Sequence, residues 1–254
     1  DLAGKRVALI GSGASAVQIV PAIAPQVQSL AVFQRTPPWV LPRNDRPISP
    51  ALQRAFARVP ALQRLWRWIL YLRQESIAIA YTVKPKLLGS WQKQSMQLIY
   101  RSVSDPLTRH KLWPHYPLGC KRALLSDDYY PAFERDHVDL ITEPISEIRG
   151  QSIVTADGRE REVDAIVLAT GFRTFNPAEE LEITGRDGRR LADDWRDGPE
   201  AYNGVLVAGY PNLFMLMGPN SGLGHNSIVF MIEAQVRYIL SALELLTRKK
   251  LRAI

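Results

Sequence analysis

Short apolar runs, a glycine-rich turn and a helical pattern follow one another at the start of the chain. Residues 6–10 form an apolar run that is typical of a strand buried on both faces of a sheet. A glycine-rich turn follows at 11–16, apolar residues at helical spacing continue to Ile23, and a second strand is expected at 29–34. This order predicts an α/β fold that opens with a Rossmann-like unit.

The hydrophobic period becomes helical between 51 and 104, after a proline-rich irregular segment at 37–50. Within this region Trp66, Trp68 and Tyr71 form an aromatic stripe. We interpret the stripe as core, and the alternative is the lining of a substrate pocket. We therefore expect a helical insertion within a nucleotide-binding domain.

Later apolar runs predict more strands and one long helix. The strands are expected at 138–142, 147–156, 162–168, 205–208 and 213–217, with Asp157-Gly158 as a hairpin turn and a short helix beginning at 127–131. Asn226 or Ser227 is expected to cap a final helix whose apolar face runs from Ile228 to Leu243. The expected domains are a Rossmann-like domain at 1–43 and 113–172, the helical insertion at 44–112, and a C-terminal segment at 173–254.

Length and composition describe an ordinary globular chain of 254 residues, 46% of them hydrophobic. No apolar run approaches the roughly 20 residues that span a bilayer, and no signal peptide is recognisable. The single cysteine, Cys120, excludes an internal disulfide and favours a reducing, cytoplasmic compartment. Because Asp1 stands only a few residues before a core strand, we expect a piece of a longer protein.

The net charge of +7 is concentrated between Arg43 and Arg122. Such a basic region is compatible with nucleic acid, an anionic membrane surface, or a solvated helical face near a pocket for an anionic cofactor. We favour the last interpretation because no nucleic-acid-binding motif accompanies the charge. We therefore expect no nucleic-acid partner and do not favour membrane contact.

The glycine turn carries the chemistry of a dinucleotide site. Gly11 permits a tight turn, Gly13 allows close approach to a pyrophosphate, and Ala16 is the small residue at the third position. The second strand ends in Arg35-Thr36, and no Asp or Glu occurs between Lys5 and Thr36. An arginine there suits the 2′-phosphate of NADP, whereas NAD calls for an acid. The alternative is a purely structural turn between strand and helix.

With these motifs in place, the chain resembles the NADPH- and FAD-dependent class B flavoprotein monooxygenases, most closely the Baeyer–Villiger branch. The resemblance covers essentially the whole chain. It rests on five motifs in order: Gly11-Ser12-Gly13-Ala14-Ser15-Ala16, Phe33-Gln34-Arg35-Thr36, Gly119-Cys120-Lys121-Arg122, Ala169-Thr170-Gly171-Phe172 and Gly218-Pro219-Asn220.

The resemblance implies a role for each matching residue. The NADP pyrophosphate would be held by the glycine turn and the helix after it, namely Gly11, Ser12, Gly13, Ala14, Ser15, Ala16 and Gln18. Arg35, Thr36 and Lys121 would surround the 2′-phosphate, and Arg122 would be the active-site arginine. The crossing to the FAD domain and its returning segment would supply Thr170, Gly171, Phe172, Asn220, His225 and Asn226.

In family terms, the implied reaction inserts one oxygen atom of O2 into a ketone through a flavin peroxide, giving an ester or lactone. The chain lacks the family's first Gly-x-Gly-x-x-Gly motif and its Phe-x-Gly-x-x-x-His-x-x-x-Trp fingerprint. We therefore expect an incomplete FAD site, with the remainder of that domain elsewhere in the protein.

Other functions stay open at this point. The close alternative is a flavoprotein that oxygenates nitrogen or sulfur, and the distant one is an NADP-binding module without catalysis. A two-dinucleotide-fold reductase is disfavoured because it needs a cysteine pair. The four histidines and Cys120 show no metal-ligand spacing, and we interpret Cys120 as inert and His115 and His225 as loop hydrogen-bonders.

Overall fold

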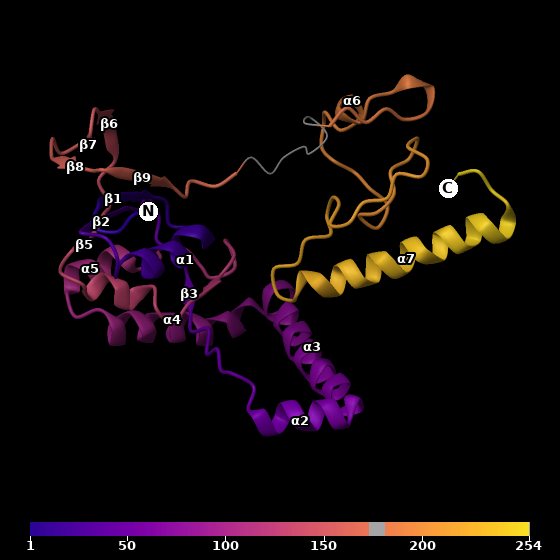
Figure 1. Ribbon diagram of the computed structural model, residues 1–254, viewed down its shortest axis with the longest axis horizontal. Coiled ribbons are helices and arrows are strands. Elements are labelled where there is room, and N and C mark those ends of the chain that lie inside the picture. Colours follow the sequence, from indigo (N-terminus) through magenta and orange to yellow (C-terminus); the bar gives the residue numbers. More distant parts are fainter. Residues whose placement is uncertain (173–180, 254) are drawn as a thin grey trace. The chain divides into compact units, whose positions relative to one another are not determined.

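The computed structural model describes residues 1–172 and 181–253 (Figure 1). Packing divides the chain into two units. The first unit holds Asp1–Gln63 and Ile79–Phe172. The second holds Arg64–Ala78 and Arg173–Ile254, and its described residues are 64–78 and 181–253.

Among the described residues, the helices are densest between 50 and 112. In chain order the helices are α1 (Ala14–Ile23), α2 (Pro50–Arg58), α3 (Pro60–Thr82), η1 (Pro85–Leu88), α4 (Gly89–Ser102), α5 (Pro106–Leu112), η2 (Tyr130–Glu134), η4 (Arg186–Gly188), α6 (Leu191–Asp194) and α7 (Ile228–Lys249). The strands are β1 (Arg6–Ile10), β2 (Ser29–Phe33), β3 (Val40–Leu41), β4 (Leu124–Leu125), β5 (Val138–Ile141), β6 (Ile145–Arg149), β7 (Ser152–Thr155), β8 (Glu160–Glu162) and β9 (Ala165–Leu168).

A parallel four-stranded sheet with the order β5-β2-β1-β9 organises the first unit. The expected α/β fold is confirmed, and β1, α1, β2, β5 and α7 lie where the sequence predicts them, to within a residue or two. The apolar run at 6–10 forms the inner strand β1, in which Val7, Ala8 and Leu9 are fully buried. Such two-sided burial is possible only in a central strand of a covered sheet.

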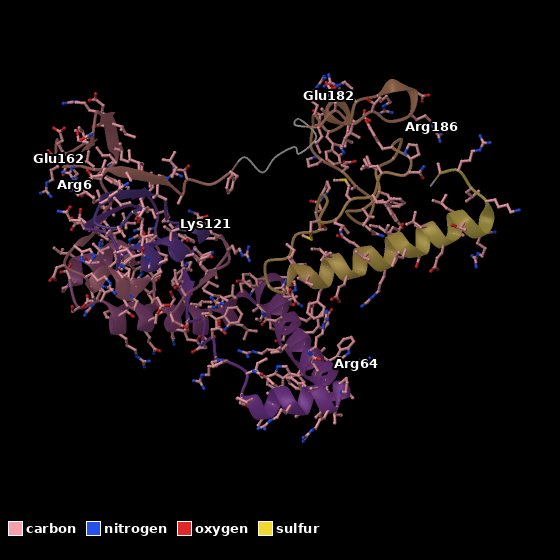
Figure 2. The ribbon with its side chains drawn as sticks, in the orientation of Figure 1. Arg6, Arg64, Lys121, Glu162, Glu182 and Arg186 are labelled. Atoms are coloured by element: carbon pink, nitrogen blue, oxygen red, sulfur yellow. The ribbon has the colours of Figure 1, made fainter. Side chains whose placement is uncertain are left out.

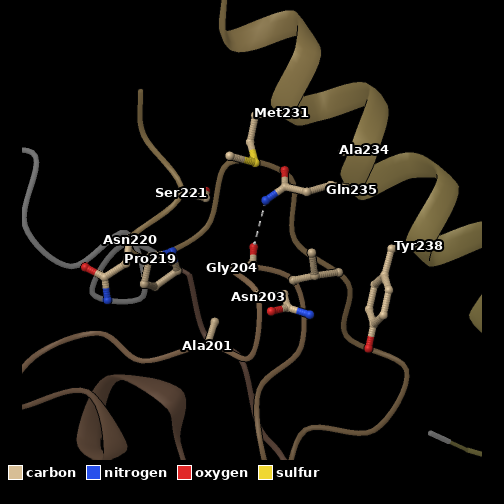
Figure 3. Close-up of a pocket in the computed structure, with 11 residues that line it drawn as sticks. Ala201, Asn203, Gly204, Pro219, Asn220, Ser221, Met231, Ala234, Gln235 and Tyr238 are labelled. Carbon is tan, nitrogen blue, oxygen red and sulfur yellow. Dashed lines mark hydrogen bonds between the residues drawn. The ribbon is translucent and has the colours of Figure 1, made fainter. Parts of the chain in front are cut away.

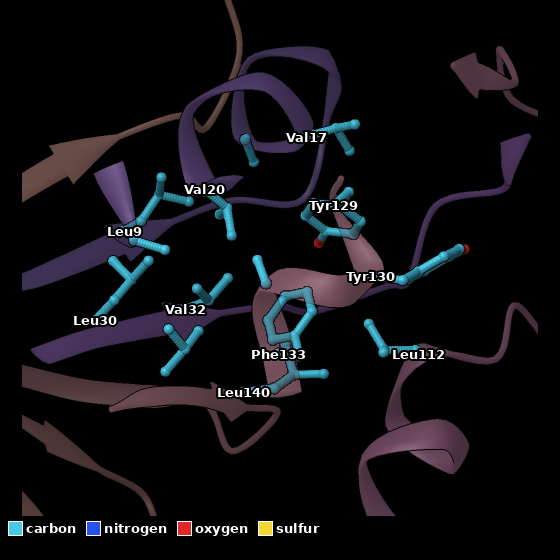
Figure 4. Packing of buried hydrophobic residues seen from close by; sticks show 14 of the residues in the cluster. Leu9, Val17, Val20, Leu30, Val32, Leu112, Tyr129, Tyr130, Phe133 and Leu140 are labelled. Atoms are coloured by element: carbon cyan, nitrogen blue, oxygen red, sulfur yellow. The ribbon is translucent and has the colours of Figure 1, made fainter. Parts of the chain in front are cut away.

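Alternate residues of each strand supply the two faces of the sheet. Leu9, Val32 and Leu140 pack with Val17 and Val20 of α1 in the main core (Figure 4). The intervening residues Ala8, Phe33 and Ile141 belong to a second cluster on the opposite face, together with Ile153 of β7. Each fully buried aliphatic side chain stabilises the fold by about 1.5–3 kcal/mol, so α1 is fixed where its N-terminus meets the end of β1.

The start of β1 is tied to the segment that leads into β9. Arg6 forms ion pairs with Asp164, at 2.7 Å, and with Glu162, and Figure 2 shows the labelled Arg6 and Glu162 side by side. The side-chain hydrogen bond from Arg6 is the main cause that lowers the pKa of Asp164 to about 2. This contact fixes the point where the chain leaves β8 and enters the parallel sheet.

Two predicted strands in this region are wrong in their extent. The run at 147–156 contains a turn at Gly150, whose φ of 54° ends β6 and lets β7 return antiparallel to it. The run at 162–168 is split because β8 pairs with β7 whereas β9 pairs with β1. The predicted turn at Asp157-Gly158 does connect β7 and β8. Strand β9 is an edge strand, with Leu168 70% exposed.

The predicted strands at 205–208 and 213–217 are also wrong. This part of the second unit holds turns and only isolated bridges among its described residues, such as Leu206 with Phe214. Positive φ values at Asn212 and Met217 interrupt any regular strand. The unit is held instead by a small cluster of Leu191, Trp195 and Tyr210.

The aromatic stripe of α3 is not core, contrary to the favoured interpretation. Trp66 is 46% exposed and Trp68 is 59% exposed. Tyr71 packs on Phe230 of α7 with ring centroids 5.1 Å apart, and Arg67 pairs with Glu233 at 2.6 Å. One of the three aromatic residues therefore holds α3 and α7 together within the second unit.

We predict that Tyr129→Phe raises the free energy of unfolding by about 1 kcal/mol. The Tyr129 hydroxyl is fully buried and has no hydrogen-bond partner among the described residues, and an unsatisfied buried polar group costs about 1–3 kcal/mol. Denaturant titration of both proteins measures the change. Tyr116→Phe is the matched control and should lower stability, because the Tyr116 hydroxyl donates to Pro37 O at 3.1 Å. A clear loss of stability in Tyr129→Phe would contradict the assignment.

Candidate functional site

A cleft of about 780 Å³ opens at the carboxyl edge of the parallel sheet, within the first unit. The carboxyl ends of parallel strands meet at one edge, where α/β proteins bind ligands. The segments after all four strands line the cleft, joined by the loop before β4. The lining residues are Ile10, Gly11, Ser12, Gly13, Ala14, Phe33, Gln34, Arg35, Thr36, Pro38, Tyr116, Lys121, Arg122, Leu124, Thr142, Glu143, Pro144, Ile145, Ala169, Thr170 and Gly171.

The fold requires a glycine at position 11, whether or not a ligand is bound. Its φ is +132°, and a Cβ built on it would lie 2.2 Å from the carbonyl oxygen of Ala169. The same junction carries two backbone hydrogen bonds, from Gly11 N–H to Phe33 O and from Ala169 N–H to Ile10 O. Strands β1, β2 and β9 therefore meet at a point that only glycine can occupy.

Gly13 differs, because nothing in the described protein lies within 4 Å of a Cβ added there. Gly13 is the N-cap of α1, and no side chain of the described residues caps this helix. The first backbone N–H groups of α1 are thus available to an anion, and the positive end of the helix dipole favours one. The open space at Gly13 fits a ligand that approaches the backbone closely.

Ser12 connects the glycine turn to the segment after β2. Its hydroxyl donates a hydrogen bond to Thr36 O at 2.7 Å. This contact sets the position of Arg35 and Thr36 relative to the start of α1. The sequence did not single out this structural contribution of Ser12, because it depends on a carbonyl 24 residues away.

Three cations line the cleft without forming an ion pair to any described residue, namely Arg35, Lys121 and Arg122. Lys121 is labelled in Figure 2, and its Nζ lies 5.0 Å from the centre of the Tyr116 ring. Burial raises the pKa of Tyr116, which keeps its hydroxyl protonated as the donor to Pro37 O. Cations without acidic partners give the cleft a positive potential that suits a phosphate.

The cleft brings together many of the predicted cofactor residues of the first unit but not all. Ser15, Ala16, Gln18 and Phe172 do not line the cleft. Ala16 is fully buried on the core-facing side of α1, Gln18 donates from its side chain to Ala14 O at 3.1 Å, and Phe172 is 92% exposed. Two cleft residues, Thr142 and Glu143, were missed by the sequence analysis, although their position directly after β5 was a usable signal.

The second unit has its own hollow of about 520 Å³, lined by residues on the loops around 201–205 and 219–221 and on α7 (Figure 3). Asn220, a predicted cofactor residue, lies on its wall. Gln235 fixes the hollow, because its side chain accepts from Met217 N–H at 2.9 Å and donates to Gly204 O at 3.4 Å.

His225 and Asn226, the other predicted cofactor residues of this unit, contact a carboxylate instead of the hollow. The Asn226 side chain donates to Glu75 Oε1 at 2.7 Å, and His225 Nε2 lies 3.4 Å from the same oxygen. These contacts hold α3 to the start of α7. Of the two predicted caps of α7, Ser227 is the N-cap, because its hydroxyl accepts from the Val229 N–H of the helix, whereas Asn226 Oδ1 accepts from the Ser227 N–H.

Neither a metal centre nor a membrane span is found in the described part of the chain. No group of three or more His, Cys, Asp or Glu side chains there could hold a metal ion. Within residues 1–172 and 181–253, no helix is long and apolar enough to cross a membrane.

Comparison with known proteins agrees with the motifs and the fold. A Baeyer–Villiger monooxygenase of Pseudomonas aeruginosa is 49% identical over 254 residues, which are 100% of this chain and 48% of that protein. A second, from Streptomyces coelicolor, is 46% identical over 239 residues, or 94% of this chain and 46% of that protein. The chain is homologous to Baeyer–Villiger monooxygenases. No protein-family model matches the chain.

Solved structures of these monooxygenases share the fold. An oxidised steroid monooxygenase bound to NADP superposes with a TM-score of 0.84 at 29% identity, covering 98% of this chain and 55% of that one. A cyclohexanone-bound cyclohexanone monooxygenase gives a TM-score of 0.83 at 28% identity, covering 100% and 56%. The chain spans about half the length of the curated relatives it matches.

We predict opposite consequences for the two glycines of the turn. Gly11→Ala should lower the free energy of unfolding by roughly 2–4 kcal/mol, because overpacking and backbone strain add. Gly13→Ala should change stability by less than about 1 kcal/mol, since its Cβ meets open space. Denaturant titration separates the two, and equal losses would contradict the described junction.

Proposed function

We propose that this chain is the NADP-binding part, with a returning segment of the FAD domain, of an NADPH- and FAD-dependent Baeyer–Villiger monooxygenase. The proposal rests mainly on the cleft. Its lining combines a glycine turn, with open space at Gly13, and three cations that form no ion pair with any described residue. The homology to Baeyer–Villiger monooxygenases supports the same reaction class, and favours ketones over nitrogen or sulfur centres as substrates.

In this proposal the cleft binds NADP through backbone and side chains. The N–H groups at the start of α1 and the turn from Gly11 to Ala14 hold the pyrophosphate. Arg35, Thr36 and Lys121 hold the 2′-phosphate, and charge-assisted hydrogen bonds make this the stronger half of the contact. The hydrogen bond from Ser12 to Thr36 O keeps the two subsites at a fixed separation.

Arg122 is the proposed catalytic residue. Together, the bound NADPH and FAD would supply the reducing equivalents and the activation of O2. A guanidinium is a planar cation with several N–H donors, and the Arg122 side chain would stabilise negative charge that develops on reacting oxygen atoms. Its freedom from ion pairs with described residues leaves that charge available.

The FAD contribution of this chain is proposed to be partial. Thr170 and Gly171 lie at the cleft, and Asn220 lies at the hollow of the second unit. The other proposed FAD residues are Phe172 in the first unit and His225 and Asn226 in the second, and we expect the remainder of the FAD site elsewhere in the protein. The proposed partners are a small organic ketone and O2, in a reducing cytoplasmic compartment.

We predict that Arg35→Ala weakens NADP binding about tenfold to a hundredfold and leaves NAD binding unchanged. The reason is that a hydrogen bond to a charged group contributes roughly 1.5–3 kcal/mol, and only NADP carries the 2′-phosphate. Calorimetric titration with both nucleotides measures the change. Arg101→Ala, which removes an exposed arginine outside the cleft, is the control. Equal losses for NADP and NAD would overturn the assignment of Arg35.

A second prediction concerns Arg122 in the full-length enzyme loaded with FAD. Arg122→Ala should abolish ester formation from a cyclic ketone, with a loss of at least about a hundredfold, while NADP still binds within about threefold of the wild type. Product analysis with parallel NADP titration measures both quantities. Normal ester formation by the variant would remove Arg122 from the mechanism.

A further inference from the structure

The end of β5 brings a carboxylate into a cleft that is otherwise cationic. Glu143 is the only acidic side chain among the described residues that line it. Glu143 is half-buried, and its Oε2 accepts a hydrogen bond from Thr142 N–H at 3.2 Å. Its Oε1 accepts no hydrogen bond from the described part of the chain, and Glu143 forms no ion pair there, although Arg35, Lys121 and Arg122 line the same cleft.

The order of the strands indicates which part of a bound dinucleotide would lie near Glu143. This inference rests on the proposed function. The pyrophosphate is assigned to the turn after β1 and the 2′-phosphate to Arg35 after β2. The neighbour of β2 on its other side is β5, with Phe33 paired to Ile141 and Gln34 N–H donating to Ile141 O at 2.8 Å. The ends of β2 and β5 are therefore adjacent, so a purine carried by the same ribose can reach the end of β5.

The surroundings of Glu143 suit a purine. Pro144 and Ile145 line the same wall and offer apolar surface to a ring. Arg35 lines the neighbouring wall, and a planar guanidinium stacks on aromatic rings. A carboxylate next to an anionic ligand is most favourable where it accepts a hydrogen bond from that ligand. The purine edge of adenine offers the two N–H groups of its exocyclic amine.

We propose that Glu143 recognises the exocyclic amine of the adenine ring and thereby makes the cleft selective for adenine over 6-oxopurine dinucleotides. The free Oε1 accepts from the amine, while the contact from Thr142 N–H holds the other oxygen. A 6-oxopurine presents a carbonyl at that position, and two acceptors then face each other. Glu143 is thus a specificity-determining residue for the base, separate from the residues that bind the phosphates.

The test compares NADP with its hypoxanthine analogue by calorimetry. We expect the wild-type protein to bind NADP at least about tenfold more tightly than the analogue, because a hydrogen bond to a charged acceptor is lost. In Glu143→Gln the ratio should fall to within about twofold, since an amide both donates and accepts. Glu143→Ala should lower the ratio of the two affinities to within about twofold as well. Asp139→Asn, which changes an exposed carboxylate on β5 outside the cleft, should keep the wild-type ratio.

An unchanged adenine preference in both Glu143 variants overturns the inference. Equal weakening of NADP and its analogue also overturns it, because that pattern belongs to a contact with the ribose. A wild-type protein that binds neither nucleotide, or that binds NAD as tightly as NADP, overturns the proposed function and with it this assignment. Normal NADP-over-NAD preference without an effect of Glu143 leaves the proposed function intact and rejects the role of Glu143 alone.

Discussion

The close approach of Ala169 to Gly11 is the constraint on which the site depends. The carbonyl oxygen of Ala169 lies where a side chain at Gly11 would begin. Because β1, β2 and β9 are hydrogen-bonded at this point, all three strands end at the same level and deliver their following segments into one cleft. The start of α1 and the bond from Ser12 to Thr36 O take their positions from this junction. A larger residue at 11 would separate the strands before any ligand was considered.

Electrostatics then decides what the cleft can hold. A folded protein usually offsets clustered cations with carboxylates, yet the cations of this cleft have no ion-pair partner among the described residues. Lys121 is held over the Tyr116 ring instead, a contact that preserves its charge. The positive potential, the uncapped N-terminus of α1 and the space at Gly13 together describe a site complementary to phosphates.

The first unit was largely predictable because its signals are local. The run at 6–10, the glycine turn and Arg35-Thr36 lie within a few residues of one another, and parallel topology brings their ends together. Other features depend on distant contacts. Gly150 divides a run that looks like one strand, and turns with positive φ replace the strands expected between 205 and 217. The exposure of Trp66 and the contacts of His225 and Asn226 with Glu75 follow from the packing of α3, which periodicity does not reveal.

The central claim is that the edge of the parallel sheet is an NADP site. A side-by-side calorimetric titration of the wild-type protein with NADP and with NAD tests it most directly. We expect NADP to bind at least about tenfold more tightly than NAD, with an affinity that falls as the salt concentration is raised, because phosphate contacts are screened. Equal affinities, or a preference for NAD, would contradict it.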